Sequence, residues 1–237
     1  MIPLKDTIRS DSFPIVNILL IAVNAFMFLI EIWMGPHLQA FLQTFGVIPA
    51  RYFALAHNDP ANIAARFLPI LVSMFLHGGW VHIIGNMWFL WIFGDNVEDR
   101  MGHLRYLIFY LLSGIGAALI HIYLNPASTV PTIGASGAIS GVMGAYFLLF
   151  PTARIITLLP IFFFVEIIEL PAILFIGYWI LLQFFGGAIS LASAHISGGI
   201  AWWAHVGGFA TGMVLLPFFK RPRSKRAQVY PDQYFPW

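Results

Sequence analysis

The sequence predicts an all-α membrane protein, built as a bundle of six transmembrane helices with a long first loop lying partly in the membrane interface. Hydrophobic residues make up 59% of the 237 residues and charged residues only 9%, whereas a soluble globular chain carries about 25% charged residues. Apolar runs long enough to cross a hydrocarbon core of about 30 Å recur along the chain. Lys and Arg gather at one predicted face, which favours membrane topology over nucleic-acid binding.

A cytoplasmic lead of residues 1–13 comes before the first predicted span, which reads as an anchor because no small-residue cleavage pattern follows it. The long connection after that span is too polar to cross the membrane, yet its aromatic side chains suit a loop in the interface plane. The predicted spans are residues 14–33, 69–93, 106–124, 136–150, 170–185 and 200–219, and a basic cytoplasmic tail of residues 220–237 follows them.

Three later connections carry predictions of their own. Residues 95–105 are expected to form a charged turn between the second and third spans. Residues 155–165 are apolar but interrupted by a proline, so they are not expected to span. Glu166 and Glu169 are expected to cap the N-terminus of the fifth span, and the Gly-, Ser- and Ala-rich residues 186–199 to form a loop.

The basic residues orient the bundle. Six spans place both termini on the same side of the membrane. If that side is the cytoplasm, it receives ten of the 12 Lys and Arg residues, and only Arg51 and Arg66 lie on the other side. This strong positive-inside pattern predicts that both termini are cytoplasmic.

Ser136 marks the point where a loop of small residues becomes a hydrophobic helix. The first free N–H groups of that helix and the positive end of its dipole lie beneath the hydroxyl, which eases its ionisation. Counting about 1.5 Å per residue from the inner anchors places Ser136, His205 and His82 roughly 27, 22 and 20 Å above those anchors. Polar groups sharing one membrane layer predict a hydrated pocket open to the outer side.

Serine nucleophiles need a base within hydrogen-bond reach and donors for the oxyanion. Gly134-Ala135-Ser136-Gly137 supplies the serine, but it lacks the second glycine of the nucleophile elbow of soluble hydrolases. Small-residue loops before membrane helices are common, so a purely structural role for this loop is the alternative. His205 is the candidate base, and interhelical hydrogen bonding is its alternative role.

Glycines on two spans favour a meeting of Ser136 and His205. Gly208 and Gly212 form a small-residue face beside His205, and Gly137 opens a similar face on the fourth span. Helices with such faces pack closely. Because the acidic residues lie elsewhere, the expected unit is a Ser–His dyad in which packing orients the imidazole.

His82 and Asn86 lie four residues apart and share a helix face. With the N–H of Ser136 they could form an oxyanion hole, and a polar contact between helices is the alternative. A metal site from His77, His82 and His205 is disfavoured, because no carboxylate or cysteine accompanies them and the five-residue step from His77 to His82 is awkward on a helix. No cofactor or metal is expected.

Taken together, these motifs resemble the rhomboid family of intramembrane serine proteases over about residues 14–219, in the family's order. They are His77-x4-His82-x3-Asn86, Glu98-x3-Gly102, Gly134-Ala135-Ser136-Gly137, Ala204-His205-x2-Gly208 and Gly208-x3-Gly212.

The resemblance implies the minimal six-span form of the family, with a membrane-embedded first loop and a fifth span that gates substrate entry. It implies Ser136 as nucleophile, His205 as general base, an oxyanion hole from His82, Asn86 and the Ser136 amide, and His77 as a structural residue. The implied substrates are transmembrane proteins in the lipid bilayer, cut next to small residues. Nucleic acid is not an expected partner, and no oligomeric state is assigned.

The expected location is the bacterial inner membrane, with the site open to the periplasmic side. Two alternatives remain. The first is a transporter with a histidine relay, which predicts paired broken helices. The second is a non-cleaving relative that binds transmembrane partners, but such relatives typically lose the serine or histidine, which this chain keeps.

Overall fold

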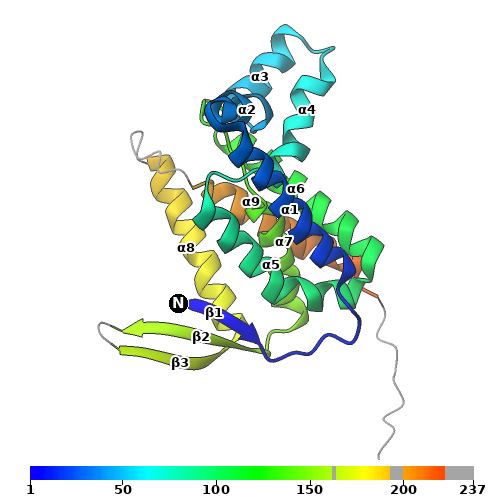
Figure 1. Ribbon diagram of the computed structural model, residues 1–237, viewed down its shortest axis with the longest axis vertical. Coiled ribbons are helices and arrows are strands. Elements are labelled where there is room, and N and C mark those ends of the chain that lie inside the picture. The colour runs from blue at the N-terminus through cyan, green and yellow to red at the C-terminus, as the bar shows by residue number, and fades with distance from the viewer. Residues whose placement is uncertain (162–163, 193–199, 222–237) are drawn as a thin grey trace, which may run out of the picture.

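The computed structural model describes residues 1–161, 164–192 and 200–221, which form a helical bundle with a small sheet beneath one end (Figure 1). The helices are α1 (Ile15–Met34), α2 (Leu38–Phe45), α3 (Pro49–Asn58), α4 (Ile63–Val72), α5 (Trp80–Met101), α6 (His103–Leu124), α7 (Ser136–Leu149), α8 (Ala172–Ala192) and α9 (Trp202–Phe219), with short 3-10 turns η1 (Gly35–His37) and η2 (Ser73–Phe75). Half of the predicted 186–199 loop, residues 193–199, and most of the tail, residues 222–237, lie outside the described residues.

Three helical segments of the described part are long and apolar enough to cross a membrane. They are Ile15–Phe45, His103–Leu124 and Ala172–Leu191. A fourth span results if Ile63–Phe75 and Trp80–Met101, which meet at an angle of 79°, are counted as one. The chain is therefore a mostly helical membrane protein, and the count of six spans stays a prediction.

The prediction of a second span over residues 69–93 is wrong at both ends. Residues 76–79 break the helix, and Gly79 there has a φ of +150°, a conformation that favours glycine. Helix α5 therefore begins at Trp80. It continues to Met101, and a single residue, Gly102 with a φ of +78°, separates α5 from α6. The residues expected to form a charged turn thus belong to the C-terminal end of α5 and the N-terminal end of α6.

A sheet corrects the prediction of an all-α fold. Strands β1 (Ile2–Asp6), β2 (Arg154–Ile161) and β3 (Phe164–Pro171) are antiparallel in the order β1-β2-β3. The run after α7 is rich in β-branched residues, which suit a strand. Pro160 is tolerated in β2 because β1 pairs only with the stretch from Ile155 to Leu158 and leaves that edge free.

The two glutamates before α8 do not cap it. Glu166 and Glu169 belong to β3, and the first turn of α8 contains no acidic residue. Glu169 instead lies 3.9 Å from the Arg154 guanidinium across the sheet. Helix α8 also continues past residue 185 through Gly186 and Gly187, which pack against the indole rings that open α9. The predicted fifth span was therefore too short.

The glycine-faced contact predicted from the sequence joins α7 and α9. A Cβ atom at Gly208 would collide with the carbonyl oxygen of Gly137, and one at Gly212 with that of Gly141. All residues of α7 from Gly137 to Tyr146 are buried. This central helix therefore meets α9 backbone to backbone, which only residues without side chains permit.

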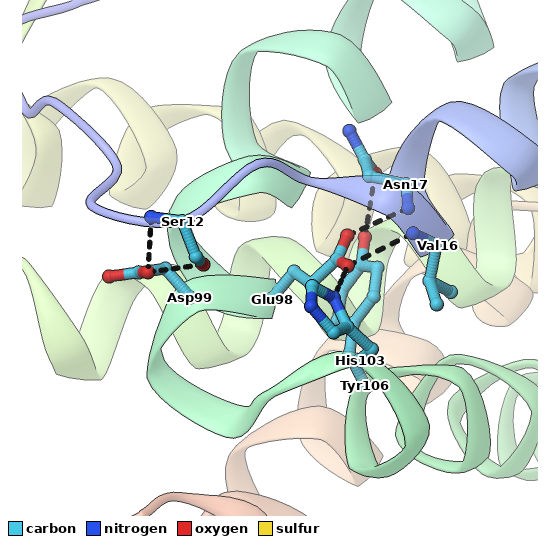
Figure 2. A network of polar contacts seen from close by, with 7 residues as sticks. All are labelled: Ser12, Val16, Asn17, Glu98, Asp99, His103 and Tyr106. Atoms are coloured by element: carbon cyan, nitrogen blue, oxygen red, sulfur yellow. Dashed lines mark hydrogen bonds and ion pairs between the residues drawn. The ribbon is translucent and has the colours of Figure 1, made fainter.

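The N-terminus of α1 is capped by a carboxylate from another helix, as Figure 2 shows. Glu98, in the last turn of α5 and fully buried, accepts the backbone N–H groups of Val16 at 2.9 Å and Asn17 at 2.7 Å. His103 Nδ1 lies 2.5 Å from the same carboxylate. Since Pro14 offers no side-chain cap, Glu98 satisfies N–H groups that the helix itself leaves free.

Replacement of Gly208 by alanine should destabilise the protein by about 1–3 kcal/mol or more, because the new methyl group overpacks the α7–α9 contact. The matched control is Gly85→Ala, since a Cβ at Gly85 on α5 meets nothing within 4 Å. Thermal unfolding in detergent, followed by tryptophan fluorescence, checks both variants. Equal stabilities of the two would contradict the packing described.

Replacement of Glu98 by alanine should cost about 1–3 kcal/mol, because two buried N–H groups at the start of α1 lose their acceptor. Asp99→Ala is the control: Asp99 accepts from exposed Ser12, and its loss should change stability by only about 0.5 kcal/mol. The same unfolding assay compares them, and a Glu98 variant as stable as the Asp99 variant would refute the capping role.

Candidate active site

The loop before Ser136 is tied to three other parts of the protein. Thr132 exchanges two backbone hydrogen bonds with Val47 of the first loop, at 2.8 and 3.0 Å, and its hydroxyl lies 3.0 Å from His121 Nε2 on α6. The Gly134 N–H donates to the Ser73 carbonyl at 2.8 Å. These contacts satisfy polar groups of a non-helical segment inside the protein, as a membrane interior requires.

Ser136 and His205 meet between two helices. Ser136 is the first residue of α7 and His205 lies in the first turn of α9. The Ser136 Oγ is 2.8 Å from His205 Nε2, across 69 residues of sequence. Sequence reasoning placed both groups in one layer, and the structure brings them into hydrogen-bond contact. The close approach of α7 and α9 is the physical reason.

The second ring nitrogen of His205 also has a hydrogen-bond partner, so the expectation that packing alone orients the imidazole is wrong. His205 Nδ1 lies 2.8 Å from Gln183 Oε1 on α8. The Trp179 ring, also on α8, lies over the imidazole with ring centroids 5.9 Å apart and planes inclined by 35°. Gln183 went unnoticed in the sequence because the search for a third member considered only acidic residues.

His82 and Asn86 project from α5 toward the loop before Ser136. A Cβ atom at Gly134 would lie 2.7 Å from His82 Nε2 and 3.6 Å from Asn86 Nδ2. Gly134 has a φ of +123°, so both glycine's conformation and its lack of a side chain are needed here. Buried Asn86 Nδ2 has no hydrogen-bond partner among the described residues. Both nitrogens therefore lie beside Gly134, two residues before Ser136.

His77 lies in the helix break, not on a helix with His82, so the objection to their spacing does not apply. Its backbone N–H donates to the Glu31 carboxylate at 3.0 and 3.1 Å. Its ring packs edge-on against His82, 5.1 Å between centroids, and within the described chain neither ring nitrogen has a hydrogen-bond partner. Glu31, buried in α1, is a neighbour of His77 that the sequence pattern did not indicate.

Within the described ranges, no group of three or more His, Cys, Asp or Glu residues could hold a metal ion. A cavity of ≈ 30 Å³ adjoins Ser136, which is room for about two water molecules. Most residues that line it are small, among them Gly114, Ala117, Ala118, Ala138, Ala201 and Ala204.

Comparison with known proteins places this chain in a family. Residues 64–222 match the Rhomboid domain model. The chain belongs to the rhomboid family. The matched region contains His82, Asn86, Ser136, Gln183 and His205, whereas all of α1 and most of the first loop lie before it.

Named relatives of this rhomboid chain come from animals, plants and fungi. Presenilin-associated rhomboid-like protein A, mitochondrial, of Danio rerio is 31% identical over 135 residues, which cover 56% of this chain and 32% of the relative. Rhomboid-like protein 11, chloroplastic, of Arabidopsis thaliana is 34% identical over 119 residues, 50% of this chain and 39% of the relative. Rhomboid protein 1, mitochondrial, of Saccharomyces cerevisiae is 28% identical over 141 residues, which cover 58% of this chain and 37% of the relative.

The matched stretch thus spans roughly a third of the length of these three relatives. Their names carry mitochondrial and chloroplast locations, whereas the sequence led us to expect a bacterial inner membrane. The shared property of chain and relatives is the rhomboid membrane domain itself.

Proposed function

We propose that this rhomboid-family chain is an intramembrane serine endopeptidase, which hydrolyses peptide bonds in or next to transmembrane segments of other membrane proteins. One observation carries the proposal: the Ser136 hydroxyl lies 2.8 Å from His205 Nε2. A serine becomes an effective nucleophile when a neighbouring base can take its proton as it attacks. Ser136 is the nucleophile in this proposal and His205 the general base.

The reaction proceeds in two halves. Ser136 Oγ attacks the scissile carbonyl carbon while its proton moves to His205 Nε2, and the tetrahedral intermediate collapses as the imidazolium returns that proton to the leaving amine. A water molecule then attacks the acyl-enzyme ester and gives a proton to His205. Collapse of this second intermediate releases the carboxyl product and returns the proton to Ser136. No cofactor takes part.

Three donors stabilise the oxyanion in this proposal: Asn86 Nδ2, His82 Nε2 and the Ser136 N–H. His82 Nδ1 accepts the Gly78 backbone N–H at 3.2 Å, so the neutral ring carries its proton on Nε2, which faces the Gly134 backbone. The unpartnered Asn86 Nδ2 supports the same assignment, because a fixed donor is most effective where negative charge develops. The ring of His77 packs edge-on against the ring of His82 and supports it.

The membrane setting of the proposal rests on the ends of the bundle. Arg221 N–H donates to the Arg100 carbonyl, and Thr7 N–H to that of Arg154, so basic segments gather at one end. The loop with Ser136 lies near the first loop, which Figure 1 shows at the other end. We therefore propose a protease domain of residues 14–219 with six spans, cytoplasmic termini and a site open to the outer side of a bacterial inner membrane.

The proposed substrates are transmembrane proteins that reach the site from the lipid bilayer. A helical segment must unwind locally before a carbonyl becomes accessible to Ser136, since its backbone is otherwise hydrogen-bonded within the helix. The small side chains around the cavity beside Ser136 favour a small residue before the scissile bond.

Fluorophosphonate labelling of the detergent-solubilised protein tests the proposed function. Wild-type protein should be labelled, and Ser136→Ala and His205→Ala should lose both labelling and cleavage of a transmembrane substrate while remaining folded. Ser113→Ala is the control, because Ser113 is a buried serine on α6 whose hydroxyl has no partner in the described part. Folded wild-type protein that is never labelled would instead favour a non-cleaving binder or a transporter.

The oxyanion assignment has its own test in Asn86→Ala. This variant should lose about 2.7–4 kcal/mol of transition-state stabilisation, a decrease in kcat of about 10²- to 10³-fold. Asn62→Ala is the control, because the Asn62 side chain caps the N-terminus of α4 and takes no part in the proposed oxyanion hole. Turnover numbers for one substrate check both variants, and near-wild-type kcat in Asn86→Ala would remove Asn86 from the oxyanion hole.

A further inference from the structure

We infer that Gln183 is the positioning residue of the dyad: it holds His205 in the tautomer that can accept the Ser136 proton, so the working unit is Ser136–His205–Gln183. The inference rests on the proposed hydrolase function and adds to it a residue from a third helix, α8. The two ring nitrogens of His205 are engaged at equal distances, Nε2 by Ser136 Oγ at 2.8 Å and Nδ1 by Gln183 Oε1 at 2.8 Å.

The tautomer follows from the chemistry of the base. To take a proton from Ser136, His205 Nε2 needs a free lone pair, so the proton of the neutral ring must be on Nδ1. A buried N–H without an acceptor is costly. Gln183 Oε1 supplies that acceptor, and it thereby favours the one tautomer in which the serine can be activated.

The orientation of the Gln183 amide is fixed by its own second contact. Its Nε2 lies 3.3 Å from the backbone carbonyl of Trp179, one turn earlier on α8. A carbonyl oxygen can only accept a hydrogen bond, so the amide must turn its NH₂ group toward Trp179 and its oxygen toward His205. The Gln183 side chain is buried, with a relative exposure of 7%, so water does not compete freely for either group.

A neutral acceptor also suits the low-dielectric surroundings. When Ser136 gives up its proton, His205 becomes an imidazolium, and its hydrogen bond to Gln183 Oε1 becomes charge-assisted and stronger. The gain is therefore largest in the transition state, where it lowers the barrier. A carboxylate in the same buried place would carry a large desolvation cost whenever His205 is neutral.

Two roles for Gln183 must be separated: positioning the base and simply joining α8 to α9. The chain offers a matched comparison, because a second hydrogen bond joins the same helices. Trp203 Nε1 on α9 donates to the Gly187 carbonyl on α8 at 3.2 Å. Trp203→Phe removes that bond and leaves His205 with both partners.

The experiment measures kcat and KM on a transmembrane substrate for the purified full chain, with thermal unfolding in parallel. Gln183→Met keeps length and loses the strong acceptor, and should lower kcat about 10- to 100-fold at unchanged KM. Gln183→Asn, whose acceptor is withdrawn by about 1.5 Å, should do the same and serves if the Met variant is unfolded. Trp203→Phe should leave kcat unchanged.

Wild-type kcat in folded Gln183→Met or Gln183→Asn would overturn the inference. A similar loss in Trp203→Phe would assign the effect to helix joining. Each of these outcomes requires a wild type that cleaves, so it tests the role of Gln183 and leaves the proposed function standing. If the wild type neither cleaves nor is labelled, the proposed function fails and the role of Gln183 fails with it.

Discussion

The close approach of α7 and α9 is the constraint on which the rest of the structure depends. Lipid tails are as apolar as the side chains they meet, so helices in a membrane associate through packing and polar contacts instead of a hydrophobic driving force. Here Gly208 and Gly212 lie against backbone carbonyls of α7, where a methyl group would not fit. That contact brings the Ser136 hydroxyl and the His205 imidazole to 2.8 Å, and it leaves no room for either helix to shift.

Around this contact, polar groups in the apolar interior are partnered by other protein groups. Glu31 accepts the N–H of His77, the loop before Ser136 is hydrogen-bonded to the first loop and to α6, and Gln183 accepts from His205. Asn86 Nδ2 is one of several exceptions within the described part, which also include the His77 ring nitrogens and the Ser113 hydroxyl. An unmade hydrogen bond of a buried donor costs about 1–3 kcal/mol, and a developing oxyanion beside Ser136 would recover it. An unfavourable feature of the resting protein would thus contribute to its proposed function.

The sequence was most informative where one physical requirement dominated. Glycine spacing predicted the α7–α9 contact, and the short apolar run after Ser136 predicted where α7 begins. The sequence was less informative where tertiary contacts determined the structure. The apolar run that became β2 and β3 looked like an interrupted membrane segment, because strand pairing with β1 cannot be seen in local pattern. Gln183 is one amide in a hydrophobic helix, and its role emerges only when α8 lies against His205.

The measurement that tests the central claim most directly is an experimental structure of the protein after reaction with a fluorophosphonate. We expect a phosphorus–oxygen bond to Ser136, a phosphoryl oxygen within hydrogen-bond distance of Asn86 Nδ2 and His82 Nε2, and α7 and α9 in unchanged contact. An adduct on another residue, or a phosphoryl oxygen directed away from both donors, would contradict that claim.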